Sequence, residues 1–145
     1  MGNLFMGNGT GRVIVINLRR GDKLLESIRE MLANNGIKNA VLCSTVGSLQ
    51  KLVYHVPQTF AQSSDDKFIT VENVGPIEIG SLTGTVIDGD PHIHIVSKAD
   101  GKTHIGHLEE GSEVLYLAEI VFLEITDLHI ERVQDEHGVV YFREK

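Results

Sequence analysis

The chain of 145 residues has a single cysteine, Cys43, no tryptophan and only three prolines. One cysteine cannot form a disulfide within the chain, so nothing in the sequence indicates an oxidising compartment, and we expect a cytoplasmic protein. A run of about 20 apolar residues, the length that crosses a bilayer, is also missing. The longest apolar stretch, 114–125, is interrupted by Glu119 and Glu124. No membrane association is therefore expected.

Positive charge is scarce as well. Thirteen Lys and Arg residues stand against 20 Asp and Glu, which gives a net charge of −7. Duplex DNA presents about one negative charge per 1.7 Å of its axis, so the average surface of this protein repels it. The one adjacent basic pair, Arg19-Arg20, is followed closely by Asp22. We therefore expect this domain alone to bind DNA weakly or not at all.

The rest of the composition is that of an ordinary globular domain, with 41% hydrophobic and 23% charged residues. A chain of this length buries roughly two thirds of the surface that it exposes when unfolded, which is enough for one stable core. The glycine-rich segment 1–11 predicts a flexible tail, and residues 12–145 predict a single domain.

Hydrophobic periodicity predicts one helix followed by many strands. The apolar run 12–18 indicates a buried strand, and apolar residues at helical spacing indicate a helix from an N-cap at Asp22 to a stop at 34–36. From residue 40 onward the period changes to two. The expected strands are 40–49, 52–56, 68–71, 77–87, 92–97, 103–108, 113–126, 128–133 and 139–142. This pattern predicts an α+β fold, a mainly antiparallel sheet packed with one principal helix.

Three of the seven histidines form a pattern that carries chemistry. His92 and His94 lie two positions apart, so both point to one face of a strand. If Asp100-Gly101 is a two-residue hairpin loop, His94 lies opposite His107 on the next strand. Facing Cβ atoms in an antiparallel pair are about 4.5–5.5 Å apart, so the three imidazoles converge. They are the candidate ligands of a metal ion; the alternative is a solvated or hydrogen-bonded face.

Imidazole ligands suit zinc and other divalent transition metals, and a three-histidine zinc site keeps an open fourth position. The same register sends His104 to the opposite face and places Glu109 opposite His92, if the strand extends that far. Glu109 is thus a candidate fourth ligand, or a carboxylate that hydrogen-bonds a ligand.

Glu119 lies in mid-strand among apolar residues, where a lone buried carboxylate is costly. It is a candidate general acid or base beside the metal; the alternative is an ion pair at a subunit contact. A long apolar strand carrying Glu119 and Glu124 in so small a chain suggests that another subunit covers part of the sheet.

Several segments together resemble the plants-and-prokaryotes-conserved (PPC) domain family in its stand-alone prokaryotic form. The resemblance extends from about Val13 to Tyr141. It is strongest in Pro91-His92-Ile93-His94, Asp100-Gly101-Lys102, Gly106-His107-Leu108, Glu110-Gly111, Ala118-Glu119-Ile120 and the segment 77–85. The departures are Pro76 for the usual Arg, Ile77 for Phe, Gly80 for Leu and Thr45 for Gly, and the first three can alter the surface that partners recognise.

The resemblance implies an acetolactate-decarboxylase-like fold, a homotrimer and, in members that keep the three histidines, a bound metal. It implies His92, His94 and His107 as the ligands, because they match the zinc-binding positions of that decarboxylase. Family members are commonly named as DNA-binding proteins, although plant relatives bind A·T-rich DNA through a separate Arg-Gly-Arg-Pro hook. These 145 residues contain no such hook.

Two hypotheses remain open at this point. The first is a homotrimeric module of the regulatory or DNA-associated type that binds zinc or another divalent transition metal. The second is a metal-dependent enzyme, of lyase or hydrolase type, that takes a small carbonyl or carboxylate substrate at the metal. In the second hypothesis Glu109 or Glu119 moves protons.

Overall fold

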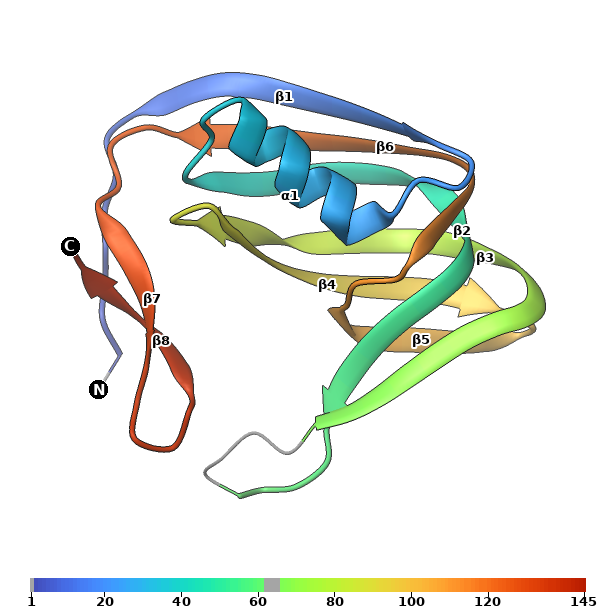
Figure 1. Cartoon of the computed structure of the whole chain (residues 1–145). Coiled ribbons are helices and arrows are strands. Elements are labelled where there is room, and N and C mark those ends of the chain that lie inside the picture. Colours follow the sequence, from blue (N-terminus) through green and yellow to red (C-terminus); the bar gives the residue numbers. More distant parts are fainter. Residues whose placement is uncertain (1, 62–65) are drawn as a thin grey trace.

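A computed structural model describes residues 2–61 and 66–145 (Figure 1). The elements follow in the order β1 (Thr10–Arg19), α1 (Leu24–Asn34), β2 (Ala40–Pro57), β3 (Asp66–Ile87), β4 (Asp90–Ala99), β5 (Lys102–Leu108), β6 (Glu113–Ile125), β7 (Ile130–Gln134) and β8 (Val140–Glu144). All strand pairs are antiparallel, and the predicted α+β class with one principal helix is confirmed. Within the described ranges no helix is long and apolar enough to cross a membrane.

Six strands form one sheet in the order β1-β6-β2-β3-β4-β5, and β2 pairs with β5 as well. The sheet therefore curls, as Figure 1 shows, while β7 and β8 form a separate hairpin. The predicted strands 40–49 and 52–56 are one continuous strand, β2, with an irregularity between Leu49 and Lys51. Before this point β2 pairs with β6, and after it with β5. A bulge bends a strand without ending it, so β2 changes partner in its middle.

The core lies between the sheet and α1. Leu24, Leu25, Ile28 and Leu32 of α1 are buried in one apolar cluster with the inward-facing residues of the strands. In β4 the alternate residues Ile93 and Ile95 belong to this cluster, whereas His92 and His94 are exposed. The strand period thus turns the histidine pair away from the core, as the sequence predicts.

The start of α1 differs from the prediction. Lys23, not Asp22, takes the N-cap position, without a side-chain hydrogen bond. The Asp22 carboxylate instead accepts a hydrogen bond from the Arg19 N–H at 2.7 Å. The first helical N–H, of Leu24, donates to the Ser112 carbonyl at 2.9 Å, so the turn before β6 supplies the cap. This contact joins α1 to the segment that carries Glu109.

The N-terminal segment is shorter than the predicted tail. β1 begins at Thr10, so the last two residues of the segment 1–11 are strand. Phe5 packs edge-on against Phe142 of β8, with ring centroids 6.4 Å apart. Residue 1 lies outside the described residues.

Candidate metal centre

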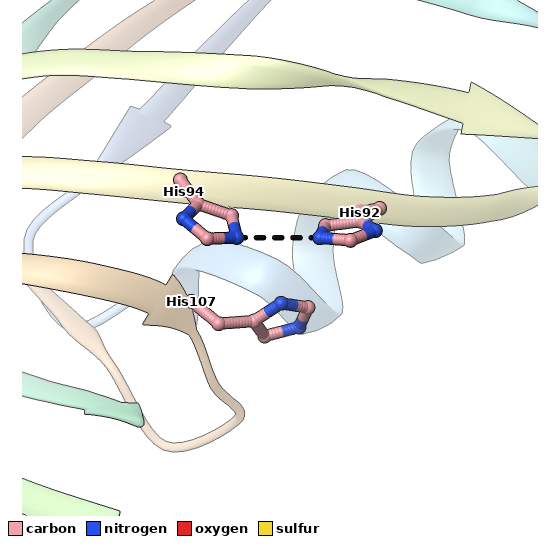
Figure 2. Close-up of side chains that lie close together, drawn as sticks. All are labelled: His92, His94 and His107. Carbon is pink, nitrogen blue, oxygen red and sulfur yellow. Dashed lines mark hydrogen bonds between the residues drawn. The ribbon is translucent and has the colours of Figure 1, made fainter. Parts of the chain in front are cut away.

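The hairpin between β4 and β5 has the predicted register. Asp100 and Gly101 both have positive φ angles, 47° and 72°, which a tight two-residue hairpin turn requires. His94 consequently lies directly opposite His107. His92, His94 and His107 point toward one another in Figure 2, with ligand atoms all within 4.8 Å.

The spacing of the first two imidazoles fits a tetrahedral ion. The Nε2 atoms of His92 and His94 are 3.2 Å apart. Two nitrogens each about 2.0–2.1 Å from a tetrahedral zinc ion lie about 3.3 Å from one another. The ring of His107 completes the group, with its centroid 4.7 Å from that of His92 and 5.4 Å from that of His94. The three side chains therefore suit a borderline-soft transition metal such as zinc.

Partial burial favours the neutral form of two of these ligands, which is the form that binds a metal. It lowers the pKa of His107 to about 4, and the neighbouring histidines, His55 first, add to the shift. Burial also lowers the pKa of His92, and the positive charge of Arg132 acts in the same direction. A metal competes with protons for these nitrogens, so a lowered pKa favours metal binding near neutral pH.

Glu109 does not take its predicted position opposite His92. β5 ends at Leu108, and the Glu109 N–H donates to the carbonyl of Val53 at 2.9 Å. The chain therefore follows β2 instead of continuing along β4. The Glu109 carboxylate lies 2.6 Å from Nδ1 of His55, and it is still close to His107. The residue belongs to the site, but with a different neighbour from the one predicted.

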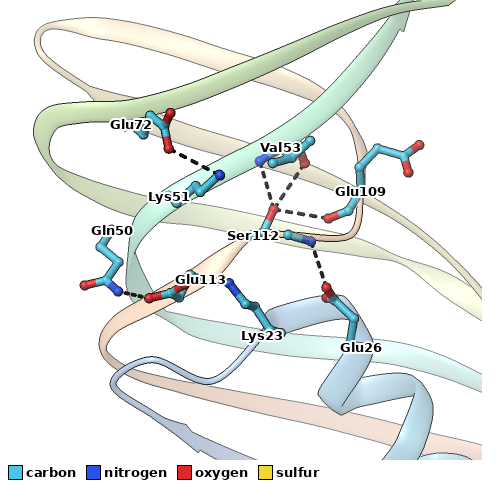
Figure 3. A network of polar contacts seen from close by, with 10 residues as sticks. Lys23, Glu26, Gln50, Lys51, Val53, Glu72, Glu109, Ser112 and Glu113 are labelled. Carbon is cyan, nitrogen blue, oxygen red and sulfur yellow. Dashed lines mark hydrogen bonds and ion pairs between the residues drawn. The ribbon is translucent and has the colours of Figure 1, made fainter.

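A buried polar network fixes the turn that carries Glu109 (Figure 3). The Ser112 hydroxyl is fully buried; it accepts from the Val53 N–H at 2.9 Å and lies 3.2 Å from the Glu109 carbonyl. The carboxylate of Glu26 on α1 accepts from the Gly111 N–H at 2.8 Å. Since these partners belong to β2 and α1, the turn is held by two core elements.

His55 is the site residue that the sequence analysis missed. It lies on the second half of β2, directly opposite His107 in the β2–β5 register. The two rings are stacked, with centroids 4.5 Å apart and planes at 19°. Nε2 of His55 lies 3.6 Å from a carboxylate oxygen of Asp66. The sequence contains a lone histidine here and no sign that β2 and β5 meet.

A cavity of about 740 Å³ opens beside the histidines, a size typical of small-molecule sites. His92, His107 and Glu109 line one part of it, and the β7–β8 hairpin lines another. Arg132 of β7 joins this hairpin to β4, because its Nη1 binds the Asp90 carboxylate at 3.3 Å. Its guanidinium also lies 5.5 Å from the centre of the Phe142 ring on β8. Two of the three candidate ligands, His92 and His107, thus face an accessible space.

Glu119 does not join this site. It is exposed on β6, opposite Asn17 and Val46, because the strand period turns Ala118 and Ile120 into the core. Among the described residues that line the cavity Glu119 does not occur, so its position does not support the role of an acid or base beside the metal.

His104 lies as predicted on the opposite face from the candidate ligands. It pairs with Ser97 across the hairpin, and its Nδ1 is 3.2 Å from the Tyr54 hydroxyl.

Comparison with known proteins gives one family match. A family model described as "Plants and Prokaryotes Conserved (PCC) domain" matches residues 6–126. A curated relative, the "Bifunctional protein GlmU" of Synechococcus sp. (strain JA-3-3Ab), is 26% identical over 128 residues, which is 88% of this chain. The chain spans only 19% of the length of that protein.

Solved structures share the fold over the whole chain. A metal-containing protein from Archaeoglobus fulgidus is 28% identical, with a TM-score of 0.80 over 98% of this chain and 99% of that one. A plant- and prokaryote-conserved (PPC) protein from Pyrococcus horikoshii is also 28% identical, with a TM-score of 0.75 over 100% and 98%. A Bacteroides thetaiotaomicron protein named "putative dna binding protein" is 18% identical, with a TM-score of 0.72 over 98% and 99%. That last likeness concerns the fold alone.

Proposed function

This chain belongs to the Plants and Prokaryotes Conserved (PCC) domain family, and from that membership and its histidine cluster we propose a self-associating, metal-binding module. His92, His94 and His107 hold one divalent transition-metal ion, zinc before others. The 3.2 Å separation of the His92 and His94 Nε2 atoms carries the proposal, because it is close to the spacing of two ligands on one tetrahedral ion. The relative from Archaeoglobus fulgidus, named as metal-containing, supports it.

Elemental analysis of protein purified without chelator tests the metal. We expect close to one tightly bound ion per chain. His94→Ala removes one of the three ligands. Structural zinc sites with four ligands have a binding free energy of about 10–16 kcal/mol, which is roughly 2.5–4 kcal/mol per ligand. Losing one ligand therefore lowers the metal affinity about 10²–10³-fold. His104→Ala, on the other face, leaves the metal in place. Less than about a tenth of an equivalent in the wild type, or equal affinity in His94→Ala, contradicts the proposal.

Self-association as a homotrimer is the second part of the proposal. Exposed apolar side chains continue across three neighbouring strands: Val13 and Val15 on β1, Leu117 on β6 and Val46 on β2. Asn17 and Glu119 lie among them on the same face. Apolar side chains exposed together on adjacent strands favour a contact with another chain. Light scattering is expected to return about three times the chain mass of 16.0 kDa. Val15→Glu lowers that mass if this face makes the contact, and a wild-type monomer contradicts the trimer.

A metal-dependent enzyme is the second candidate, favoured by the cavity beside the histidines. A bound metal there supplies a Lewis acid that polarises an oxygen or activates water. Glu109 is placed to accept or return a proton, since its carboxylate lines the cavity and Ser112 and Glu26 fix its turn.

Acetohydroxamate, which chelates metals through two oxygens, distinguishes the candidates. It changes the visible spectrum of Co²⁺-loaded protein if the ion has a position open to the cavity. An unchanged spectrum argues for a purely structural metal and against the enzyme.

Binding of DNA by this domain alone is not favoured by its charges. Within the described part of the chain, seven of the 13 basic residues lie in ion pairs with carboxylates: Arg12, Lys23, Arg29, Lys51, Arg132, Arg143 and Lys145. A net charge of −7 per chain adds repulsion. We expect an affinity for an A·T-rich duplex no better than the non-specific range of about 10⁻⁴–10⁻⁶ M. Fluorescence anisotropy at about physiological salt measures it, and tight, steeply salt-dependent binding contradicts this expectation.

A further inference from the structure

A second group of ligand atoms lies beside the three histidines. His55, His107 and Glu109 each offer one atom, all within 4.8 Å of one another, and all three line the cavity. We propose that these residues form a second cation position that shares His107 with the first, so that a saturated chain holds two divalent transition-metal ions. The inference rests on the proposed function, because His107 serves both positions.

The charges around His55 suit a second cation. The first group consists of three imidazoles and brings no negative charge to the ion. Around His55, by contrast, the Glu109 carboxylate lies 2.6 Å from Nδ1 and an Asp66 carboxylate oxygen 3.6 Å from Nε2. Two dications a few ångströms apart repel each other strongly, so the second binds only where anionic groups offset that repulsion. The carboxylates of Glu109 and Asp66 supply this negative charge beside His55, where the second cation would bind.

The present distances indicate that the second position is the weaker one. His55 Nδ1 and Glu109 Oε1 are joined by a hydrogen bond of 2.6 Å, whereas two ligands of a tetrahedral ion lie about 3.3 Å apart, so the pair must open by about 0.7 Å. His92 and His94, at 3.2 Å, need no such opening. The first ion therefore enters the three-histidine group, and the second binds at least about tenfold more weakly, since it must also replace a hydrogen bond to a charged group.

The proton balance of the second step follows from the ligands. A neutral imidazole has one free ring nitrogen and one that carries a proton. His107 serves two ions only after its remaining ring proton passes to solvent. His55 serves one ion, so the proton between His55 and Glu109 moves through solvent to Nε2 of the same ring, which stays neutral. No other bond is formed or broken, and no oxidant or reductant is needed.

The support behind Glu109 favours a cation position over a loose surface pair. Its turn is held by the buried Ser112 hydroxyl and by Glu26 on α1 (Figure 3), while His55 is fixed in the β2–β5 ladder and stacked on His107. Ligands held by core elements lose little conformational freedom when an ion binds. The arrangement needs the small opening described above and a rotation of one of the two stacked rings, because the lone pairs of ring nitrogens lie in the ring planes.

Titration of the metal-free chain with Co²⁺, followed by absorption and by elemental analysis, tests the inference. We expect two phases and two ions per chain in the wild type. His55→Ala and Glu109→Gln each retain the first phase and lose the second. Glu110→Gln is the matched control, because its carboxylate lines the same cavity but pairs with Arg29; it retains both phases. With Cu²⁺, the shared ring of His107 couples the two ions and reduces the paramagnetic resonance signal below that of two isolated ions.

The outcomes separate the inference from the proposed function. One ion in the wild type, merely weakened by His55→Ala, overturns the second position and leaves His55 as a support for His107. Two ions that persist in both His55→Ala and Glu109→Gln place the second ion elsewhere and also overturn it. If His94→Ala loses the tight phase and keeps the weaker one, the result supports both the proposed function and the second cation position. If His94→Ala leaves the tight phase unaffected, the result refutes the proposed function itself.

Discussion

Gly106 is the position where the fold of the sheet and the geometry of the site depend on one another. β5 crosses β2 here so closely that a Cβ atom on Gly106 would lie 2.4 Å from the carbonyl oxygen of His55 and 2.6 Å from Cδ2 of Tyr54. Even close C–H···O contacts keep carbon and oxygen about 3.3 Å apart. Gly106→Ala must therefore move the strands apart by about 0.9 Å, and a hydrogen bond of about 2.9 Å does not survive that displacement.

The cost can be worked from this displacement. In the described parts of the chain the β2–β5 ladder has two residue pairs, Tyr54 with Leu108 and His55 with His107. Losing one or two net hydrogen bonds costs about 0.5–1.5 kcal/mol each, and overpacking adds about 1–3 kcal/mol. The sum is about 1.5–6 kcal/mol, which lowers the thermal unfolding midpoint of a domain of this size by roughly 3–24 °C. Metal content also falls, because His107 moves with β5.

Thermal unfolding by circular dichroism at one fixed protein concentration measures the effect, with metal content determined on the same samples. Gly80→Ala is the matched control: its Cβ would lie 3.3 Å from the carbonyl of Val96, a contact that a small shift relieves. We expect Gly80→Ala to cost less than about 1 kcal/mol. If Gly106→Ala is no less stable than Gly80→Ala, the close crossing of β2 and β5 is not what holds the site together.

Three further predictions follow from the site and its supports. Metal-free protein should lose folding stability as the pH falls from about 6.5 to about 4. The pKa of His107 is lowered to about 4 in the folded state, so the unfolded chain protonates this histidine at a higher pH than the folded chain does. A His107→Gln variant whose stability falls equally steeply with pH contradicts this. Ser112→Ala should cost about 1–3 kcal/mol, because the partly buried Val53 N–H loses the Ser112 hydroxyl as its acceptor. Thr45→Val, whose buried hydroxyl has no partner among the described residues, should be neutral or stabilising in the same denaturation assay. Arg132→Met should free the β7–β8 hairpin from Asp90 and raise the pKa of His92, because a positive charge beside the imidazole is removed. Unchanged proteolysis at residues 134–139 and an unchanged titration of His92 by NMR would both argue against this contact of Arg132.

The features that the sequence predicts well are local. The β4–β5 hairpin depends on Asp100 and Gly101 and on the alternation beside them, so the meeting of His94 and His107 could be worked out by counting. The pairing of His55 with His107 could not, because it depends on the curl of the sheet and the bend in β2. The position of Glu109 was mispredicted for the same reason. Its backbone N–H binds the carbonyl of Val53, more than 50 residues away in sequence, so Glu109 lies beside β2 and not opposite His92 on β4.

The sequence left two readings of Glu119 open for a different physical reason. β6 is apolar on both faces, with Ala118 and Ile120 in the core and Leu117 exposed on the other side. A strand of that composition does not reveal which face is inward, because the period of two fits either choice. The sequence therefore left open whether Glu119 lies beside the metal or at a subunit contact, and in the structure its side chain is exposed. An exposed Glu119 on this face fits the proposed subunit contact.

The arrangement of β4 separates the chemistry of the site from the stability of the fold. Ile93 and Ile95 are at most 1% exposed and anchor the strand in the core, while His92 and His94 project from its other face. Replacing either histidine removes little buried apolar surface, so the folded state should tolerate it. His107 differs, because it lies between Gly106 and the fully buried Leu108 at the close crossing of β5 and β2. A metal-binding defect in His92→Ala or His94→Ala therefore reports on the ligand itself, whereas the same defect in a His107 variant must be compared with a change in stability before it is assigned to the metal.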